Sequence, residues 1–64
     1  MINLPGGTYV LVVEDEPAMR EMLRWALEDE GLVVVLAIDG PEGIKFATTR
    51  RPALVVLNSM SRVC

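Results

Sequence analysis

The stretch at residues 10–17 constrains the fold most, because four apolar residues run directly into three acids and a proline. An apolar run without polar alternation is typical of a parallel strand covered on both faces. Pro17 suits the first turn of a helix, where its missing N–H is not needed. Glu14 and Asp15 are therefore predicted at a strand-to-helix junction, where open α/β sheets place their ligand sites. The alternative is that these acids only stabilise the helix N-terminus, by ~0.3–1 kcal/mol each.

The residues after Pro17 have the period of an amphipathic helix. Its predicted inward stripe consists of Met19, Met22, Leu23, Ala26 and Leu27. Two ion pairs at i,i+4 spacing are expected along it, Glu16–Arg20 and Arg24–Glu28. Gly31 is a natural stop for this helix. Trp25 lies away from the stripe, where it is either a partner contact or a partly buried side chain at the margin.

A strand, a second helix and a third strand follow. Residues 32–37 form an apolar run and predict a strand covered on both faces. Asp39 and Glu42 have the spacing of a capping box and predict a helix that ends near Thr49. The inner face of this helix is predicted to hold Ile44 and Ala47. Residues 53–57 are again apolar and predict the third strand.

This order of elements predicts an α/β domain with a doubly wound parallel sheet. Two crossovers that join parallel strands are almost always right-handed. If the first strand lies in the middle, in the order second, first, third, the two helices cover opposite faces. The ends of the first and third strands then lie side by side. We therefore expect Glu14, Asp15 and Asn58 to converge, although they are far apart in the sequence.

Composition excludes several classes of protein. The chain is 52% hydrophobic and 23% charged, which is unlike a disordered chain. Its net charge of -3 and scattered basic residues argue against direct nucleic-acid binding. The longest apolar run, residues 32–38, is far below the ~20 residues that span a bilayer. With no signal peptide and one cysteine, Cys64, the chain is expected in the cytoplasm.

Four segments of the chain resemble the receiver domain of two-component response regulators. They are residues 11–17, 30–31, 37–42 and 51–58, in the same spacing as in that family. The resemblance implies a flavodoxin-like sheet, of which residues 9–60 form the N-terminal half only. Residues 1–8 are expected as a flexible leader, and residues 61–64 as an irregular tail.

The resemblance also implies a phosphorylation site with a bound Mg²⁺. Asp15 takes the place of the direct metal ligand, and Glu14 that of the second acid, which often binds through a water. The backbone carbonyl of Met60 takes the third place. Asn58 stands where the family has its phospho-accepting aspartate. Because a neutral amide cannot form an acyl phosphate, we expect no phosphotransfer and weakened Mg²⁺ binding.

A truncated, non-phosphorylatable receiver module of a phosphorelay is therefore the expected function. The family domain continues through two further strands, with a hydroxyl residue and a lysine that contact the phosphoryl group. A histidine kinase or another phosphorelay protein is the expected partner, and the open edge of residues 54–57 invites self-association. We expect the isolated chain to be unstable, oligomeric or partly molten.

Two other functions stay open at this stage. One is a phosphorylation-independent interaction module that binds its partner through the first helix and Trp25. The other is a gene fragment without a function of its own. An enzyme is not expected, because the chain has no histidine, its cysteine is the last residue, and no glycine-rich phosphate loop follows a strand.

Overall fold

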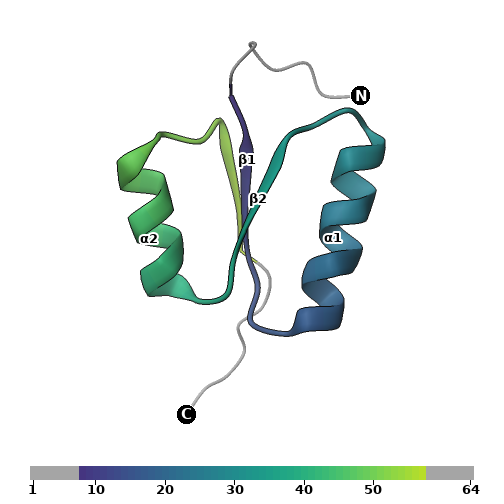
Figure 1. The fold of residues 1–64 in the computed structure, drawn as a ribbon, viewed down its shortest axis with the longest axis horizontal. Helices are drawn as coiled ribbons and strands as arrows, with labels where there is room; N and C mark the ends of the chain where they lie inside the picture. Colours follow the sequence, from purple (N-terminus) through teal and green to yellow (C-terminus); the bar gives the residue numbers. More distant parts are fainter. Residues whose placement is uncertain (1–7, 58–64) are drawn as a thin grey trace.

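The computed structural model describes residues 8–57, which form alternating strands and helices (Figure 1). The elements are β1 (Val10–Val13), α1 (Pro17–Asp29), β2 (Val34–Ala37), α2 (Gly40–Thr49) and β3 (Leu54–Leu57). The predicted element order is confirmed. β1 covers all four residues of its apolar run, whereas β2 is two residues and β3 one residue shorter than the predicted run. The predicted tail, and the predicted leader up to residue 7, lie outside the described residues.

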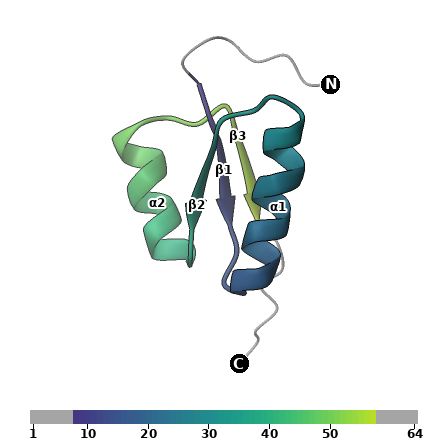
Figure 2. The ribbon, with the colours of Figure 1, turned by 45° about the vertical axis from the view of Figure 1, so that its right-hand side comes forward.

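Strand β1 is the centre of a three-stranded parallel sheet in the order β2-β1-β3. Its last residue, Val13, pairs with Ala37 of β2 on one side and with Leu57 of β3 on the other. Figure 2 shows the three strands side by side and pointing the same way. The predicted flavodoxin-like, doubly wound topology is confirmed, and the carboxyl ends of all three strands lie at one edge of the sheet.

The two helices cover opposite faces of the sheet, one on each side in Figure 1. Because side chains alternate along a strand, β1 contributes to a separate core on each face. The core under α2 consists of Tyr9, Leu11, Val13 and Ala37, with Phe46 and Ala47 packed against it. The core under α1 consists of Val10, Val12 and Leu32, with Leu23 and Leu27 packed against it. Strand β1 is thus the element that both helices bury.

Helix α1 presents a narrower inward face than predicted. Leu23 and Leu27 pack against the sheet, whereas Met19 and Met22 of the predicted stripe are exposed. Trp25 is 73% exposed, so the interpretation of a partly buried side chain at the margin of the stripe is wrong. The physical reason is that α1 lies over β1 and β2 only, which leaves no sheet surface for a wider stripe.

Helix α2 is also rotated relative to the prediction. Ile44, predicted as an inner residue, is exposed, and Phe46 packs inward together with Ala47. Gly43 explains the rotation: it is buried, and a Cβ atom built there would lie 2.8 Å from Cγ2 of Val13. The missing side chain lets the helix backbone approach β1 closely, and the residues three and four positions later then face the sheet.

The helix ends follow the predicted signals. Asp39 is the N-cap of α2, and its Oδ1 accepts a hydrogen bond of 2.9 Å from the backbone N–H of Glu42. Glu42 Oε1 in turn accepts one of 2.8 Å from the N–H of Ile38, one residue earlier than in a standard capping box. Gly31 ends α1 with a φ of 87°, a left-handed conformation that favours glycine.

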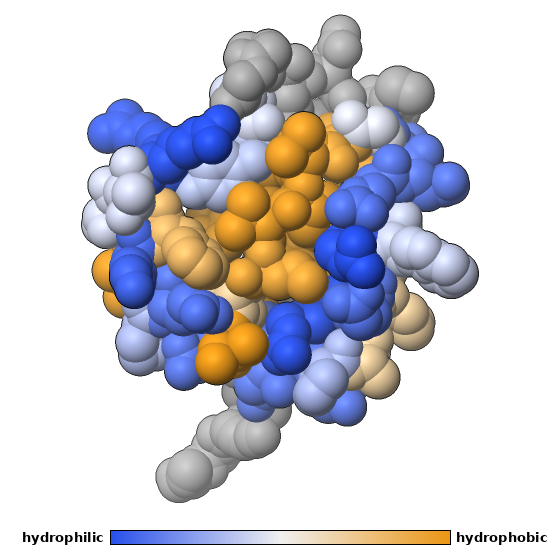
Figure 3. Space-filling model, viewed as in Figure 1, coloured by the Kyte–Doolittle hydropathy of each residue, from blue (hydrophilic) through white to orange (hydrophobic). Residues whose placement is uncertain are grey.

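Strand β3 is the least covered element of the structure. It pairs with β1, and no Cα atom of either helix lies within 8 Å of a β3 Cα atom. Leu54, Val55 and Leu57 are consequently exposed. The other outer strand, β2, also has apolar surface, and Figure 3 shows apolar atoms gathered over the middle of the view, where β2 lies in Figure 1. Neither of the two described helices is long and apolar enough to cross a membrane.

Candidate functional site

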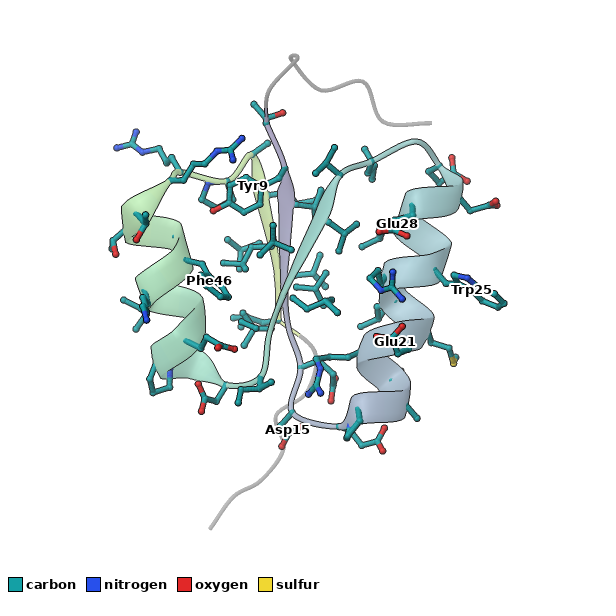
Figure 4. All side chains as sticks on the ribbon, viewed as in Figure 1. Tyr9, Asp15, Glu21, Trp25, Glu28 and Phe46 are labelled. Atoms are coloured by element: carbon teal, nitrogen blue, oxygen red, sulfur yellow. The ribbon has the colours of Figure 1, made fainter. Side chains whose placement is uncertain are left out.

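The acids predicted at the strand-to-helix junction lie there in the structure. Glu14 directly follows β1 and is 3% exposed, although its side chain is a carboxylic acid. Asp15 is exposed and lies in the loop between β1 and α1, as Figure 4 shows. The two neighbouring acids are therefore unlike: Glu14 is part of the protein interior, and Asp15 lies at the surface.

Hydrogen bonds hold Glu14 at three points. Its backbone N–H donates to the carbonyl of Ala37 at 3.1 Å, which links the ends of β1 and β2. Its Oε2 accepts from the N–H of Glu16 at 2.8 Å. Its backbone carbonyl accepts from Nη1 of Arg20 at 3.0 Å. The buried acid is thereby tied to the neighbouring strand, to its own loop and to α1.

The third acid, Glu16, has a structural role that the sequence interpretation missed. It is the N-cap of α1, and its Oε1 accepts a hydrogen bond of 2.9 Å from the N–H of Met19. The predicted Glu16–Arg20 ion pair is wrong, because Glu16 caps the helix while Arg20 turns back to Glu14. The position of Glu16 directly before a proline at the first helical residue is the signal that could have revealed the cap.

The second predicted ion pair of α1 is confirmed and is part of a larger group. Arg24 contacts Glu21 and also Glu28, the latter at 3.4 Å between Nη1 and Oε1. The hydrogen bond and the charge of Glu21, followed by the charge of Glu28, raise the pKa of Arg24 above its ordinary value. This group lies along α1 and outside the junction with the acid pair, so it is not part of the candidate site (Figure 4).

The end of β3 reaches the same edge of the sheet as the acid pair. Val13, which precedes Glu14, is paired with Leu57, the last described residue. Asn58 and Met60, the other two predicted site residues, lie outside the described residues. The structure thus brings together the strand ends that the sequence interpretation placed side by side, and the roles of Asn58 and Met60 stay predictions.

The acid pair fits Mg²⁺ in the kind of atom that it offers. Mg²⁺ prefers oxygen ligands and is commonly held by one or two carboxylates together with waters. Asp15 offers an exposed carboxylate, and Glu14 offers a fixed one, of which Oε2 already accepts a hydrogen bond. Within residues 8–57 no group of three or more histidine, cysteine, aspartate or glutamate side chains could hold a metal ion. Two of the predicted ligands, Glu14 and Asp15, thus lie within the described residues, and their binding of Mg²⁺ stays a prediction.

The chain is similar to several bacterial regulatory proteins over most of its length. It is 47% identical over 51 residues to the KDP operon transcriptional regulatory protein KdpE of Escherichia coli, which covers 80% of this chain and 23% of that protein. It is 43% identical over 51 residues to the alkaline phosphatase synthesis transcriptional regulatory protein PhoP of Bacillus subtilis, covering 80% of this chain and 21% of that protein. The chain thus spans less than a quarter of the length of these relatives.

A further similar protein is the probable transcriptional regulatory protein TcrX of Mycobacterium tuberculosis, 47% identical over 51 residues, or 80% of this chain and 22% of that protein. No solved structure gives a significant match to the chain. The family model of the response regulator receiver domain matches residues 10–61. Together with the parallel sheet in the order β2-β1-β3, this match shows that the chain belongs to the response regulator receiver domain family.

Proposed function

We propose that the chain is a receiver-like module of a phosphorelay that does not itself accept a phosphoryl group. The observation that carries the proposal is the convergence of the acid pair after β1 with the end of β3, where the next residue in the sequence is Asn58. A phospho-accepting residue at that position must offer a carboxylate nucleophile. An amide nitrogen is delocalised into its carbonyl and has no such reactivity, so the chain would bind its partners without acyl phosphate chemistry.

The proposed metal site is built on Asp15. Its exposed carboxylate would contact Mg²⁺ directly, while Glu14, buried and hydrogen-bonded, would reach the ion through a water. The backbone carbonyl of Met60 would complete the protein ligands. Bound Mg²⁺ would neutralise the charge of the acid pair. With an amide instead of a third carboxylate nearby, we expect weak binding.

A histidine kinase or another phosphorelay protein is the proposed partner, and the cytoplasm is the proposed compartment. The test is to incubate the chain with a phosphorylated histidine kinase and measure acid-labile phosphate on it. We expect none, while a receiver with an aspartate at the corresponding position is labelled in the same reaction. Clear labelling of this chain would contradict the proposed role of Asn58.

A second candidate function is suggested by the outer surface of α1. Trp25 points away from the sheet, as Figure 4 shows, and is 73% exposed. Two adjoining hollows on this surface share Met22 and Trp25, and Glu21, Glu28 and Asp29 lie around them. An exposed tryptophan with apolar neighbours is typical of an interface anchor. A phosphorylation-independent interaction module would bind its partner here.

The test of this second function compares two exposed apolar residues. Trp25→Ala removes the proposed anchor, whereas Ile44→Ala removes an exposed side chain of α2 on the opposite side of the sheet. If α1 binds the kinase or a partner receiver, Trp25→Ala weakens binding by about 30-fold, and Ile44→Ala leaves it unchanged. Equal binding of both variants and the wild type would count against this surface.

Self-association through β3 is the third part of the proposal. The outer edge of β3 is apolar through Leu54, Val55 and Leu57, and no charged residue lies within the strand. Such an edge offers unpaired backbone groups to another strand. We expect the 64-residue chain to form oligomers that dissociate on dilution, as measured by sedimentation. A monomer with a cooperative unfolding transition in dilute solution would contradict this expectation.

A further inference from the structure

Arg20 is the one basic side chain that contacts the candidate site within the described residues. It lies in the first turns of α1, where its backbone N–H donates to the carbonyl of Glu16 at 2.9 Å. Its side chain turns back over the loop, and Nη1 donates to the carbonyl of Glu14 at 3.0 Å. Arg20 is half-buried and forms no ion pair with residues 8–57.

The contact from Arg20 acts on the peptide that joins the two acids. The carbonyl of Glu14 and the N–H of Asp15 belong to one planar peptide unit. A donor that holds this carbonyl therefore also fixes the direction in which Asp15 leaves the strand. Because the guanidinium is charged, the hydrogen bond is stronger than one between two neutral groups.

Arg20 also places a positive charge within hydrogen-bond distance of the backbone that joins the two acids. Arginine stays protonated at every physiological pH, so this charge is permanent. The Nη1 atom of Arg20 contacts the carbonyl of Glu14, which is buried, and Asp15 follows Glu14 in the chain. A fixed cation at this place reduces the repulsion between the two carboxylates before any metal ion binds.

We propose that Arg20 is a positioning residue that holds the Glu14–Asp15 peptide in the geometry in which the acid pair receives Mg²⁺. This inference rests on the proposed function, because it assumes that the acid pair binds Mg²⁺. The hydrogen bond from Arg20 to the carbonyl of Glu14 does not itself require the metal ion.

Removing Arg20 should change Mg²⁺ affinity in two opposite ways. Loss of the hydrogen bond loosens the loop, which lowers affinity, because residues that orient metal ligands commonly contribute about 10-fold or more. Loss of the positive charge raises affinity for a cation, but salt screens this effect over a Debye length of ~8 Å at ~0.15 M. The proposal predicts that the geometric effect is larger at that ionic strength.

The experiment uses three variants of the full chain. Arg20→Met removes the donor and the charge, whereas Arg20→Lys keeps the charge and a donor. Arg24→Met is the matched control, because Arg24 lies one turn later on α1 and contacts Glu21 and Glu28 instead of the loop. Mg²⁺ affinity is measured from NMR shifts of the loop amides. Hydrogen exchange of the Glu16 amide, which donates to Glu14, is measured without metal.

We expect Arg20→Met to weaken Mg²⁺ binding by about 10-fold and to speed exchange of the Glu16 amide, with the amides of the sheet unchanged. In both measurements, the value for Arg20→Lys should lie between those of Arg20→Met and the wild type. Arg24→Met should have the Mg²⁺ affinity and the exchange rate of the wild type. If Arg20→Met does not fold, Arg20→Lys is compared with Arg24→Met in both measurements, and the same direction is expected.

The proposal is overturned if the Arg20 variant binds Mg²⁺ as tightly as the wild type or more tightly, or if its metal-free loop amides exchange at the wild-type rate. Failure of the proposed function looks different. In that case Mg²⁺ shifts the NMR signals of the loop amides no more in the wild type than in the Asp15→Asn variant. The exchange measurement on metal-free protein then still tests whether Arg20 fixes the loop.

Discussion

Strands β1 and β3 have nearly the same composition but very different surroundings. β1 reads Val-Leu-Val-Val and β3 reads Leu-Val-Val-Leu, and the two are paired residue for residue. No residue of β1 is more than 4% exposed, whereas Leu54, Val55 and Leu57 of β3 are 43–67% exposed. The difference shows that the position of a strand in the sheet, and not its apolar sequence, determines its burial.

The cause of the difference is the number of neighbours. β1 has a strand on each side and a helix on each face, while β3 has β1 on one side and no helix Cα atom within 8 Å of its own. Since hydrophobic stabilisation is roughly proportional to the apolar area removed from water, β1 contributes far more to the free energy of folding than β3 does. The acid pair follows β1, so the candidate site is attached to the most buried strand of the structure.

The largest expected effect contrasts the same substitution in the two strands. Leu11→Ala in β1 deletes a fully buried side chain and should cost ~2–5 kcal/mol, which matches the ~3–5 kcal/mol that a core of this size commonly supplies. Leu57→Ala in β3 should change the free energy of unfolding by only about 0.5 kcal/mol. Urea unfolding at low protein concentration measures both. Similar losses in the two variants would mean that β3 is covered in solution.

An intermediate effect is expected where α2 approaches β1. Gly43→Ala places a methyl group 2.8 Å from Cγ2 of Val13, and overpacking of this kind costs ~1–3 kcal/mol. This loss opposes the ~1 kcal/mol that alanine gains over glycine in a helix. The matched control is Gly40→Ala, because nothing lies within 4 Å of a Cβ atom built at Gly40.

We expect Gly43→Ala to lower the thermal midpoint and Gly40→Ala to leave it equal or slightly higher. The close approach at Gly43 is to β1, and no helix Cα atom lies within 8 Å of a Cα atom of β3. A stabilised Gly43→Ala variant would show that α2 is held less closely against β1 than its Gly43–Val13 contact indicates.

The smallest effect is expected at the outer charges of α1. Arg24 has a pKa raised above the ordinary arginine value, first by the hydrogen bond to Glu21. A raised pKa in the folded state stabilises the protein at every pH below the unfolded value, and this contribution is lost only as the pH rises through the higher folded value. The side chain of Arg24 is 36% exposed, and that of Glu21 is 59% exposed, so salt and water screen their interaction.

Arg24→Met should therefore change the thermal midpoint little, and by the same amount at pH 6 and pH 9. Thermal unfolding of both proteins at the two pH values measures this. A difference between wild type and variant that grows between pH 6 and pH 9 would mean that another titrating group depends on Arg24. In either case the effect should be far below that of Leu11→Ala in β1.

Much of the fold could be predicted from local sequence, because the signals are local in origin. Apolar runs identified the three strands, and Asp39 and Gly31 marked helix ends through their own backbone and side-chain preferences. The order β2-β1-β3 was a condition in the sequence analysis, under which the two helices cover opposite faces, and the structure shows that order. The position of Glu14 and Asp15 at the junction followed from the same pattern.

The contacts within the candidate site could not be predicted, because they depend on how elements meet. The spacing of Glu16 and Arg20 predicted an ion pair, and only the structure shows that Glu16 caps α1 while Arg20 holds Glu14. Tyr9 likewise gave no sign that its hydroxyl reaches the carbonyls of Phe46, at 3.2 Å, and Arg50 at the end of α2. These contacts join residues that are separate in the sequence.

The sequence by itself determined which segments are apolar, where the helices begin and end, and that two acids follow the first strand. These properties arise from interactions between residues a few positions apart. The tertiary structure decided which of two nearly identical strands is buried, which face of each helix is turned inward, and which of the two acids is exposed. Burial depends on neighbours on all sides, and the short-range pattern of the chain does not contain them.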